Sequence, residues 1–318
     1  MNKIYFAWLL FATYTSTACQ EKVLICGVCK DTEKSVPFTI ESIEALGAHF
    51  ADYAVIIYEN NSADNTPCLY REWAEKNSRV HFTSEIIRQD QLETSRTEII
   101  AKARNNVLSL AKDPQYDDFK YLIMADLDFS KVLWPIEEIL EALELPEEWD
   151  CICANGINSN QEFLDLYSFR DSHFPFGAEM LGDKIWWKHL DEKRSKIGGD
   201  TLLPVYSAFG GLAIYKRDTI IRFSYSGIVT ENLREHYQNI LRSIPQKHPQ
   251  LQEYLHLLNL PEDSDLSTVP IVFQNNTTWE HEGYPLLQTC CEHVPLHASM
   301  TIHGFGKIFI YPKMKMYY

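Results

Sequence analysis

The sequence lacks an excess of positive charge. Its 29 Lys and Arg residues stand against 44 Asp and Glu residues, which gives a formal net charge of -15 at pH 7. Nucleic acids are polyanions that are held mainly by cationic side chains, so this balance argues against a nucleic acid as partner. A small anionic substrate is compatible with it, because a few local cations are enough to bind one.

Long apolar runs are also scarce, and the one candidate lies at the N-terminus. Lys3 precedes an apolar stretch from Ile4 to Ala12, and small or polar residues follow up to Ala18. The pattern is typical of a signal peptide over residues 1–18, with a short uncleaved anchor as the alternative. A membrane span needs about 20 apolar residues, so we expect none after cleavage. A secretory, secreted or periplasmic location follows, with membrane anchoring as the alternative.

Cysteine is too sparse for a disulfide scaffold, with eight residues in a chain of 318. Cys26 and Cys29 resemble a redox C-x-x-C motif, but they fall in a strand-like segment, where positions i and i+3 point to opposite faces. Cys151 and Cys153 are expected to share one strand face. Whether they are core thiols or a bridge stays open at this point.

The first half of the chain does contain a regular alternation of strand-like and helix-like segments. Strand patterns cover residues 22–29, 53–58, 80–83 and the run that ends at Asp126; helix patterns cover residues 35–49, 66–76 and a segment ending near Leu110. This order predicts an α/β fold with a mostly parallel sheet flanked by helices, which binds ligands beyond the carboxyl ends of its strands. Because no repeat or linker interrupts the chain, we expect a single elaborated domain over residues 21–318.

Two carboxylates stand at the end of one of these strands. Asp126 and Asp128 are separated by one residue, so on an extended backbone they leave the same face while Leu127 turns inward. Like charges this close favour a bound cation, and carboxylate oxygens suit Mg2+ or Mn2+. An isolated D-x-D is often only a solvated turn, so its meaning depends on the elements around it.

Two further elements precede this acidic pair. The strand that ends at Tyr58 runs into a polar segment, residues 59–66, whose side chains suit hydrogen bonds to a nucleoside, although helix capping alone explains Asp64. Arg96 and Arg104 lie on the next helix and are suited to neutralise a diphosphate, with a solvated basic helix face as the alternative.

Together these segments resemble nucleotide-sugar glycosyltransferases of the GT-A fold, with a Rossmann-like sheet. Residues 59–66 resemble their acidic-Ser-x-Asp-Asn-Thr segment, residues 103–105 their Ala-Arg-Asn, and residues 126–128 their metal motif. Residues 166–171, 174–177 and 207–215 are similar to the fungal capsule-associated α-1,3-mannosyltransferase group. The likeness covers about residues 22–215 and 288–312. A segment of about residues 222–283 is unmatched and is expected to be a helical insertion.

The resemblance implies a role for each candidate site residue. Nucleotide-sugar binding falls to Glu59, Asn61, Asp64, Arg96, Arg104, Asn105 and Asp126, and metal binding to Asp126 and Asp128. Many relatives carry Glu-Asp where this chain has Glu292-His293. His293 and His297, one helical turn apart, are therefore candidates to complete the metal shell, and Glu292 is the candidate general base or acceptor ligand.

The sequence thus predicts a glycosyltransferase that depends on Mn2+ or Mg2+. It would move a hexose such as mannose, glucose or galactose from a nucleoside diphosphate sugar to a hydroxyl of a glycan, glycoprotein or glycolipid. Two alternatives stay open. One is an aspartyl phosphotransferase that uses Asp126 and Asp128 near the Ser130 hydroxyl, although in that class the motif normally follows the first strand. The other is a non-catalytic module that binds nucleotide sugars.

Overall fold

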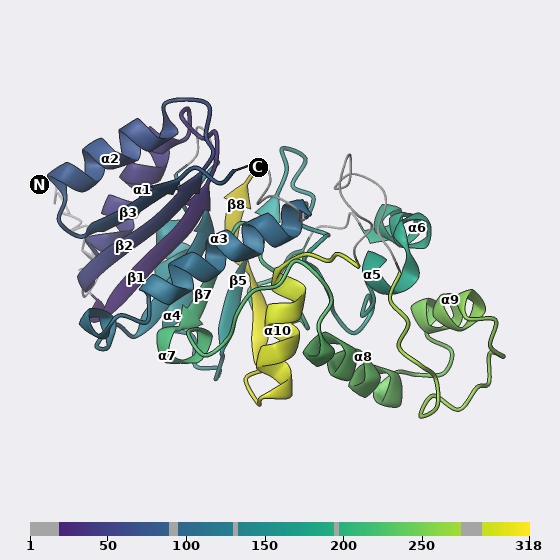
Figure 1. Cartoon of the computed structure of the whole chain (residues 1–318). Coiled ribbons are helices and arrows are strands. Elements are labelled where there is room, and N and C mark those ends of the chain that lie inside the picture. The colour runs from purple at the N-terminus through teal and green to yellow at the C-terminus, as the bar shows by residue number, and fades with distance from the viewer. Residues whose placement is uncertain (1–18, 89–94, 130–132, 194–196, 275–287) are drawn as a thin grey trace, which may run out of the picture.

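The computed structural model describes residues 19–88, 95–129, 133–193, 197–274 and 288–318. Within these residues a central sheet is flanked by helices, and a second group of helices extends from one side of it (Figure 1). The predicted signal peptide and Ser130 lie outside the described residues. No helix among the described residues is long and apolar enough to cross a bilayer.

The sheet has eight strands in the order β3-β2-β1-β4-β7-β5-β8-β6. They are β1 (Cys19–Cys29), β2 (Phe50–Asn60), β3 (Val80–Glu85), β4 (Tyr121–Asp126), β5 (Cys151–Ile157), β6 (Leu203–Pro204), β7 (Leu212–Lys216) and β8 (Ile308–Tyr317). Strands β1 to β4 are parallel to one another, and β5 is parallel to β8. In contrast, β7 is antiparallel to β4 and β5, and β6 to β8. The predicted mostly parallel α/β sheet is confirmed.

The first three helices begin and end close to where the sequence places them. The helices are α1 (Val36–Gly47), α2 (Thr66–Lys76), α3 (Arg96–Leu110), α4 (Ile136–Leu143), α5 (Ala178–Leu181), α6 (Asp183–Lys193), α7 (Arg217–Ile220), α8 (Glu231–Ser243), α9 (Pro249–Leu257) and α10 (His293–Ile302). The start of α3 is capped by Ser95, whose hydroxyl accepts a hydrogen bond from the Glu98 amide. The described part of the helical insertion expected over about residues 222–283 contains two helices, α8 and α9, separated by residues 244–248.

Side chains of β1 alternate between two cores, one on each face of the sheet. Leu24 and Cys26 pack with residues of α3 and α10, whereas Val23, Ile25 and Cys29 pack with residues of α1, α2 and α4. A parallel sheet is stable when both faces are covered in this way. Cys26 and Cys29 therefore face opposite cores, as the strand pattern predicts, and do not form a redox pair.

One strand starts later than the sequence suggests. Residues 207–215 read as a continuous strand, but β7 begins only at Leu212. The cause is the backbone at Gly210 and Gly211, whose φ angles are 64° and 86°. A side chain at either position would also collide, since an added Cβ would lie 2.1 Å from the Ala154 carbonyl oxygen or 2.2 Å from the Phe129 ring. The result is a loop pressed against the end of β4.

The helical group beside the sheet has its own core, which α10 shares. It combines Met180 from α5, Tyr237 from α8 and Tyr254 from α9 with Val294 from α10. A buried ion pair joins Arg170 to the carboxylate on α5, with 2.8 Å between Nη2 and Glu179 Oε2, and the Tyr237 hydroxyl donates to the same carboxylate. This core fixes α10 on one side while the sheet fixes it on the other.

His236 in α8 links stability to pH. Burial lowers its pKa to about 4, and only 6% of the residue is exposed. In the unfolded chain this ring is protonated below about pH 6.5, whereas in the folded protein it stays neutral down to about pH 4. The folded state therefore keeps its full stability above pH 6.5 and loses stability as the pH falls toward 4. The variant His236→Phe keeps an aromatic ring against Tyr206 but has no group to protonate. Between pH 7 and pH 5 we expect its unfolding free energy to fall by about 2 kcal/mol less than that of the wild type. Denaturant titration at both pH values measures it.

The control for this experiment is His256→Gln, a change at an exposed histidine of α9. That variant should lose as much stability as the wild type between the two pH values. If His236→Phe does the same, the buried imidazole is not the group that responds to acid.

Candidate active site

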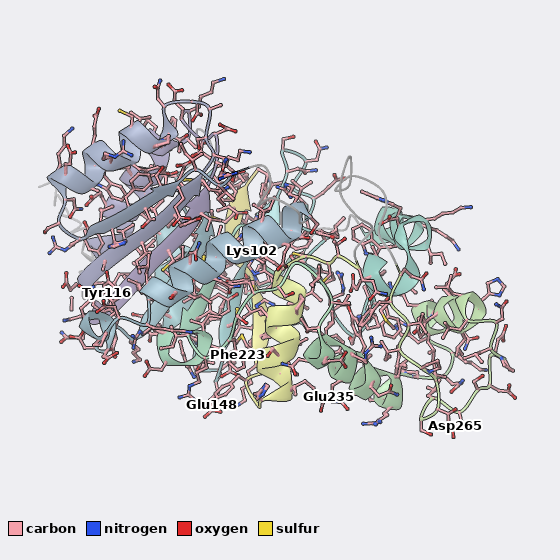
Figure 2. All side chains as sticks on the ribbon, in the orientation of Figure 1. Lys102, Tyr116, Glu148, Phe223, Glu235 and Asp265 are labelled. Carbon is pink, nitrogen blue, oxygen red and sulfur yellow. The ribbon has the colours of Figure 1, made fainter. Side chains whose placement is uncertain are left out.

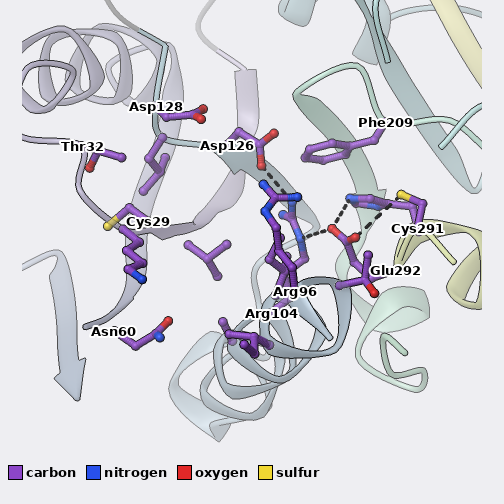
Figure 3. Close-up of a pocket in the computed structure, with 18 of the residues that line it drawn as sticks. Cys29, Thr32, Asn60, Arg96, Arg104, Asp126, Asp128, Phe209, Cys291 and Glu292 are labelled. Carbon is purple, nitrogen blue, oxygen red and sulfur yellow. Dashed lines mark hydrogen bonds and ion pairs between the residues drawn. The ribbon is translucent and has the colours of Figure 1, made fainter. Parts of the chain in front are cut away.

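A cavity of about 760 Å³ opens at the carboxyl ends of β1 and β4. In the sheet β1 pairs with β2 on one side and β4 on the other, and Val28 stands opposite Asp126. Ligands of open α/β sheets bind at such a switch of strand order. The lining residues come from the strand ends, from α3, from residues 165, 167, 209 and 318, and from the start of α10, and Figure 3 shows most of them around a common space. The volume suits a ligand of nucleotide-sugar size.

The acidic pair lies on one wall of this cavity. Asp126 is the last residue of β4, and its amide donates to the Gly211 carbonyl over 2.9 Å, so the glycine loop fixes its position. Asp128 lies just beyond the strand with its side chain exposed, while its carbonyl accepts from the Ser35 hydroxyl over 2.9 Å. Leu127 between them is 1% exposed. The predicted placement of these two carboxylates is observed.

The burial of Asp126 opposes its ionisation. Its side chain lies deep in the fold and keeps 27% exposure. Burial raises the pKa of Asp126 to about 7; Arg104 counteracts the shift, while Asp128 and Glu292 add to it. A divalent cation would stabilise the ionised form of carboxylates placed this close more than the single charge of Arg104 does.

Arg104 is the central side chain of the cavity. Its Nη2 donates to Asp126 Oδ1 over 2.8 Å and its Nε to Glu292 Oε1 over 3.1 Å. The guanidinium carbon lies 4.7 Å from the centre of the Phe209 ring, and the side chain is 3% exposed. Its third nitrogen, Nη1, is buried and has no partner among the described residues. A buried donor without a partner is costly, so this nitrogen is suited to an oxygen of a ligand.

A second cation of α3 lies at the entrance. Arg96 is exposed and lines the cavity two helical turns before Arg104. Lys102, which Figure 2 labels on the same helix, is exposed and does not line the cavity. The predicted basic helix is therefore divided, with Arg96 and Arg104 toward the cavity and Lys102 in solvent.

Glu292 and His293 form the opposite wall, at the start of α10. Glu292 is 6% exposed and accepts from Arg104, and the His293 Nε2 lies 3.5 Å from its Oε1. The His293 ring stacks on Phe209 with 3.9 Å between ring centres. Burial lowers the pKa of His293 well below its usual value, with Arg104 adding to the effect, so the ring is neutral. Both of its nitrogens lack hydrogen-bond partners among the described residues.

These groups suit a hard divalent cation. Asp126 and Asp128 offer carboxylate oxygens on one wall, whereas His293, whose nitrogens lack hydrogen-bond partners among the described residues, lies on the opposite wall and is not grouped with them. The two carboxylates therefore suit the Mn2+ or Mg2+ that the sequence predicts, and His293 as a further ligand stays a prediction.

His297 is not brought to this site, although the sequence offers it as a metal ligand. Its ring is fully buried, with Nδ1 3.1 Å from the Ser207 hydroxyl and Nε2 3.0 Å from the Tyr215 hydroxyl, and it does not line the cavity. One helical turn separates it from His293, and that turn carries its ring into the core beneath the sheet. The geometry gives no support to His297 as a ligand beside Asp126.

The polar segment after β2 divides in a similar way. Asn61 lines the cavity, with φ 57° and both ends of its amide bonded to the Ile87 backbone. Glu59 accepts from the Ser62 amide and the Ser84 hydroxyl, and Asp64 from the amides of Glu33 and Thr66. Neither Glu59 nor Asp64 lines the cavity. Their carboxylates build the loop, which is the capping role that the sequence leaves open for Asp64.

Asn105 has a positioning role. Its side chain donates to the Tyr225 carbonyl over 2.9 Å and accepts from the Tyr225 amide over 2.8 Å. Tyr225 in turn has its ring centre 5.8 Å from the Arg104 guanidinium and 5.3 Å from His293. Asn105 thus holds a loop against Arg104 rather than lining the cavity itself.

Sequence reasoning did not select Asp165, which also lines the cavity. Its Oδ2 accepts from the Ser168 hydroxyl over 2.6 Å and from the Gly210 amide over 2.8 Å. Burial raises the pKa of Asp165, and these hydrogen bonds oppose the shift. Its only signal in the sequence is that it directly precedes the run at residues 166–171.

A mostly parallel sheet with an acidic pair at a strand end, facing arginines of the preceding helix, is the arrangement expected of a glycosyltransferase of the GT-A class. The family model described as Cryptococcal mannosyltransferase 1 matches residues 25–254. The chain belongs to this family. Among curated proteins, none matches the chain.

Several solved structures are similar to parts of the chain. The mannosyltransferase PcManGT from Pyrobaculum calidifontis, in complex with GDP-Man and Mn2+, is 14% identical with a TM-score of 0.39 over 72% of this chain and 54% of its own. TarS from S. aureus is 15% identical with a TM-score of 0.37 over 70% and 33%. Glucosyl-3-phosphoglycerate synthase from Mycobacterium tuberculosis, with Mn2+, UDP and phosphoglyceric acid, is 11% identical with a TM-score of 0.36 over 64% and 58%. The chain thus spans less than two thirds of each.

Proposed function

We propose that the protein transfers a hexose, mannose foremost, from a nucleoside diphosphate sugar to a hydroxyl group of a glycan, glycoprotein or glycolipid, with Mn2+ or Mg2+ bound at the site. The family description supports mannose. The observation that carries the proposal is Arg104, which bridges Asp126 and Glu292 and leaves one buried guanidinium nitrogen without a partner inside the cavity.

The diphosphate of the donor would lie between the two walls. Arg104 would donate its free Nη1–H to a phosphate oxygen, and Arg96 would approach from the entrance. Asp126, Asp128 and His293 would hold the cation, which supplies a Lewis acid for the departing nucleotide. Asn61, which lines the cavity near the end of β2, would face the nucleoside. Most of the rate enhancement would then come from charge placement and orientation.

The opposite side of the cavity would hold the sugar and the acceptor. Asp165 lines it with one oxygen fixed by Ser168 and Gly210, and Phe209 offers an apolar ring. Glu292 would take the proton of the acceptor hydroxyl in an inverting reaction, or orient the hydroxyl in a retaining one. The Arg104 contact keeps Glu292 facing the cavity in either case.

A thermal-shift screen tests the donor half of the proposal. The full chain is melted with GDP, UDP, ADP or CDP, with and without Mn2+. A nucleotide at 100 times its Kd stabilises the folded state by about 2.7 kcal/mol, so one base should raise the melting temperature, and more so with Mn2+. The matching nucleotide sugar is then tested for release of nucleoside diphosphate. No shift with any base, with or without Mn2+, would contradict the proposal.

The same experiments separate the two alternatives. A module that only binds would show the thermal shift without turnover on any donor. A phosphotransferase would hydrolyse small phosphoesters and ignore nucleotide sugars. The position of the acidic pair supports the transferase over the phosphotransferase. The pair follows β4, whereas the first strand, β1, ends in Cys29.

We also propose that the protein works in the secretory pathway or outside the cell, because residues 1–18 read as a signal peptide. N-terminal sequencing of the protein secreted by its host tests the cleavage after Ala18. An intact N-terminus would favour the anchored alternative.

Asp165→Asn should weaken turnover while the glycine loop is kept. The new amide still offers an oxygen to the Gly210 N–H, but the negative charge toward the cavity is lost. Hydrogen bonds to charged groups contribute about 1.5–3 kcal/mol, so we expect kcat/KM for the nucleotide sugar to fall about 10- to 100-fold. Steady-state kinetics measures it. Asp263→Asn, in an exposed loop, is the control, and equal activity of the two variants would exclude Asp165 from the site.

A further inference from the structure

A second cluster of metal-ligand side chains lies in the core, away from the cavity. Cys151 and Cys153 come from β5 and His297 from α10, and each is fully buried. As the sequence predicts, the two cysteines share a strand face, with 3.5 Å between their sulfur atoms. The Cys151 sulfur lies 3.8 Å from His297 Nε2, and the ligand atoms of all three residues lie within 4.8 Å of one another.

Two of these separations, 3.5 Å between the sulfur atoms and 3.8 Å from the Cys151 sulfur to His297 Nε2, are close to those of a tetrahedral zinc site. With Zn–S near 2.3 Å and Zn–N near 2.0 Å, two ligand atoms of one tetrahedron lie about 3.5–3.8 Å apart. Core thiols that merely pack need no such match with an imidazole nitrogen. A disulfide would need the sulfurs about 2 Å apart, and they sit at 3.5 Å on one extended strand.

The surroundings prepare His297 for this role. Its Nδ1 lies 3.1 Å from the Ser207 hydroxyl, which is able to accept the Nδ1–H and leave the Nε2 lone pair toward Cys151. The Tyr215 hydroxyl lies 3.0 Å from Nε2, on the strand paired with β5 at Cys151, and offers an oxygen for a fourth position. Two thiolates and one Zn2+ also cancel in charge, which a dry core requires.

We propose that Cys151, Cys153 and His297 bind a structural Zn2+ that fastens α10 to β5. The ring centres of His297 and His293 are 6.0 Å apart on the same helix. A metal at His297 would therefore fix the helix end that carries Glu292 and His293 into the cavity, without taking part in the reaction. The proposal is independent of the activity proposed above, since it concerns ligands that the cavity does not contain.

Metal content of the full chain tests the proposal. Protein purified without chelator should carry about one zinc per chain by elemental mass spectrometry. After exchange with Co2+ during refolding, it should show the near-ultraviolet absorption of a thiolate–cobalt bond. Asp128→Asn should keep both signals, because it alters only the cavity. Protein from which the metal has been removed in mild denaturant and which is then returned to buffer should melt several degrees below the zinc-bound protein.

Matched variants locate the metal. Cys153→Ala and His297→Gln should lose the zinc and the cobalt spectrum, whereas Cys26→Ala, at another buried cysteine of the same sheet, should keep both. The proposal would be overturned if the wild-type protein carried no zinc and showed no thiolate–cobalt band. Both measurements are made on the wild type, so neither depends on whether a variant folds. A Cys151–Cys153 disulfide found by mass spectrometry, or a spectrum unchanged in Cys153→Ala, would overturn it as well.

Discussion

Asp128→Asn is expected to reduce turnover of the nucleotide sugar by about 10³-fold while the melting temperature stays within about 2 °C of the wild type. The Asp128 side chain is exposed, and the Ser35 hydroxyl bonds to its carbonyl, which the substitution leaves intact. The amide keeps the shape but removes the charge that would hold the cation. Initial rates measured against Mn2+ concentration should show a much higher metal requirement.

The matched control is Glu137→Gln, which neutralises an exposed carboxylate in the first turn of α4 and should leave the rate unchanged. Chelation of the wild type should reproduce the defect, and added Mn2+ should reverse it. An Asp128→Asn enzyme with full activity, or a wild type indifferent to chelator, would show that the acidic pair is not a metal site.

Arg104→Lys is expected to lower kcat/KM by about 10²-fold although the positive charge is kept. The guanidinium contacts Asp126 through Nη2 and Glu292 through Nε, and still has Nη1 for a ligand. An ammonium group is a point charge on a flexible stem and does not reproduce this fork. Loss of a charge-assisted contact to a phosphate, about 3 kcal/mol, accounts for the size of the effect.

Kinetics and melting must be read together for this variant, because Arg104 is 3% exposed and its ion pairs also hold the fold. Lys102→Gln, two residues away on the solvent side of α3, is the control and should match the wild type in both. If Arg104→Lys lowers the melting temperature yet retains the wild-type kcat/KM, the arginine has a purely structural role.

The groups that the sequence predicts best lie at the end of a regular element. Asp126 ends a buried strand. Arg104 lies three residues before Val107, on the buried side of the same helix. Because the parallel order fixes which strand ends meet, the side chains at those ends can be placed without the structure. Arg104 contacts Asp126 for this reason.

Short polar segments are less predictable. Glu59, Asp64 and Asn105 are polar and near the cavity, yet each is bound to nearby backbone or hydroxyl groups. Local hydrogen bonds of this kind compete with ligand binding, and the residue types are the same in both cases.

The two histidines show a further limit. His293 and His297 share a helix face by spacing, but α10 lies between two cores, so one ring reaches the cavity and the other lies under the sheet. Asp165 escapes prediction because its partner, the Gly210 amide, is 45 residues away in the sequence.

The Arg104 bridge also bears on when the protein becomes competent during synthesis. Its partners, Asp126 and Glu292, are 22 and 188 residues away along the chain. The sheet shows the same delay, because its last strand, β8, is inserted between β5 and β6. When α3 and β4 have emerged from the ribosome, the nascent chain has one wall of the cavity. Glu292, which belongs to the opposite wall, has not yet been made. The cavity is therefore completed only when the C-terminal segment has docked, which places the assembly of the site in the last step of folding.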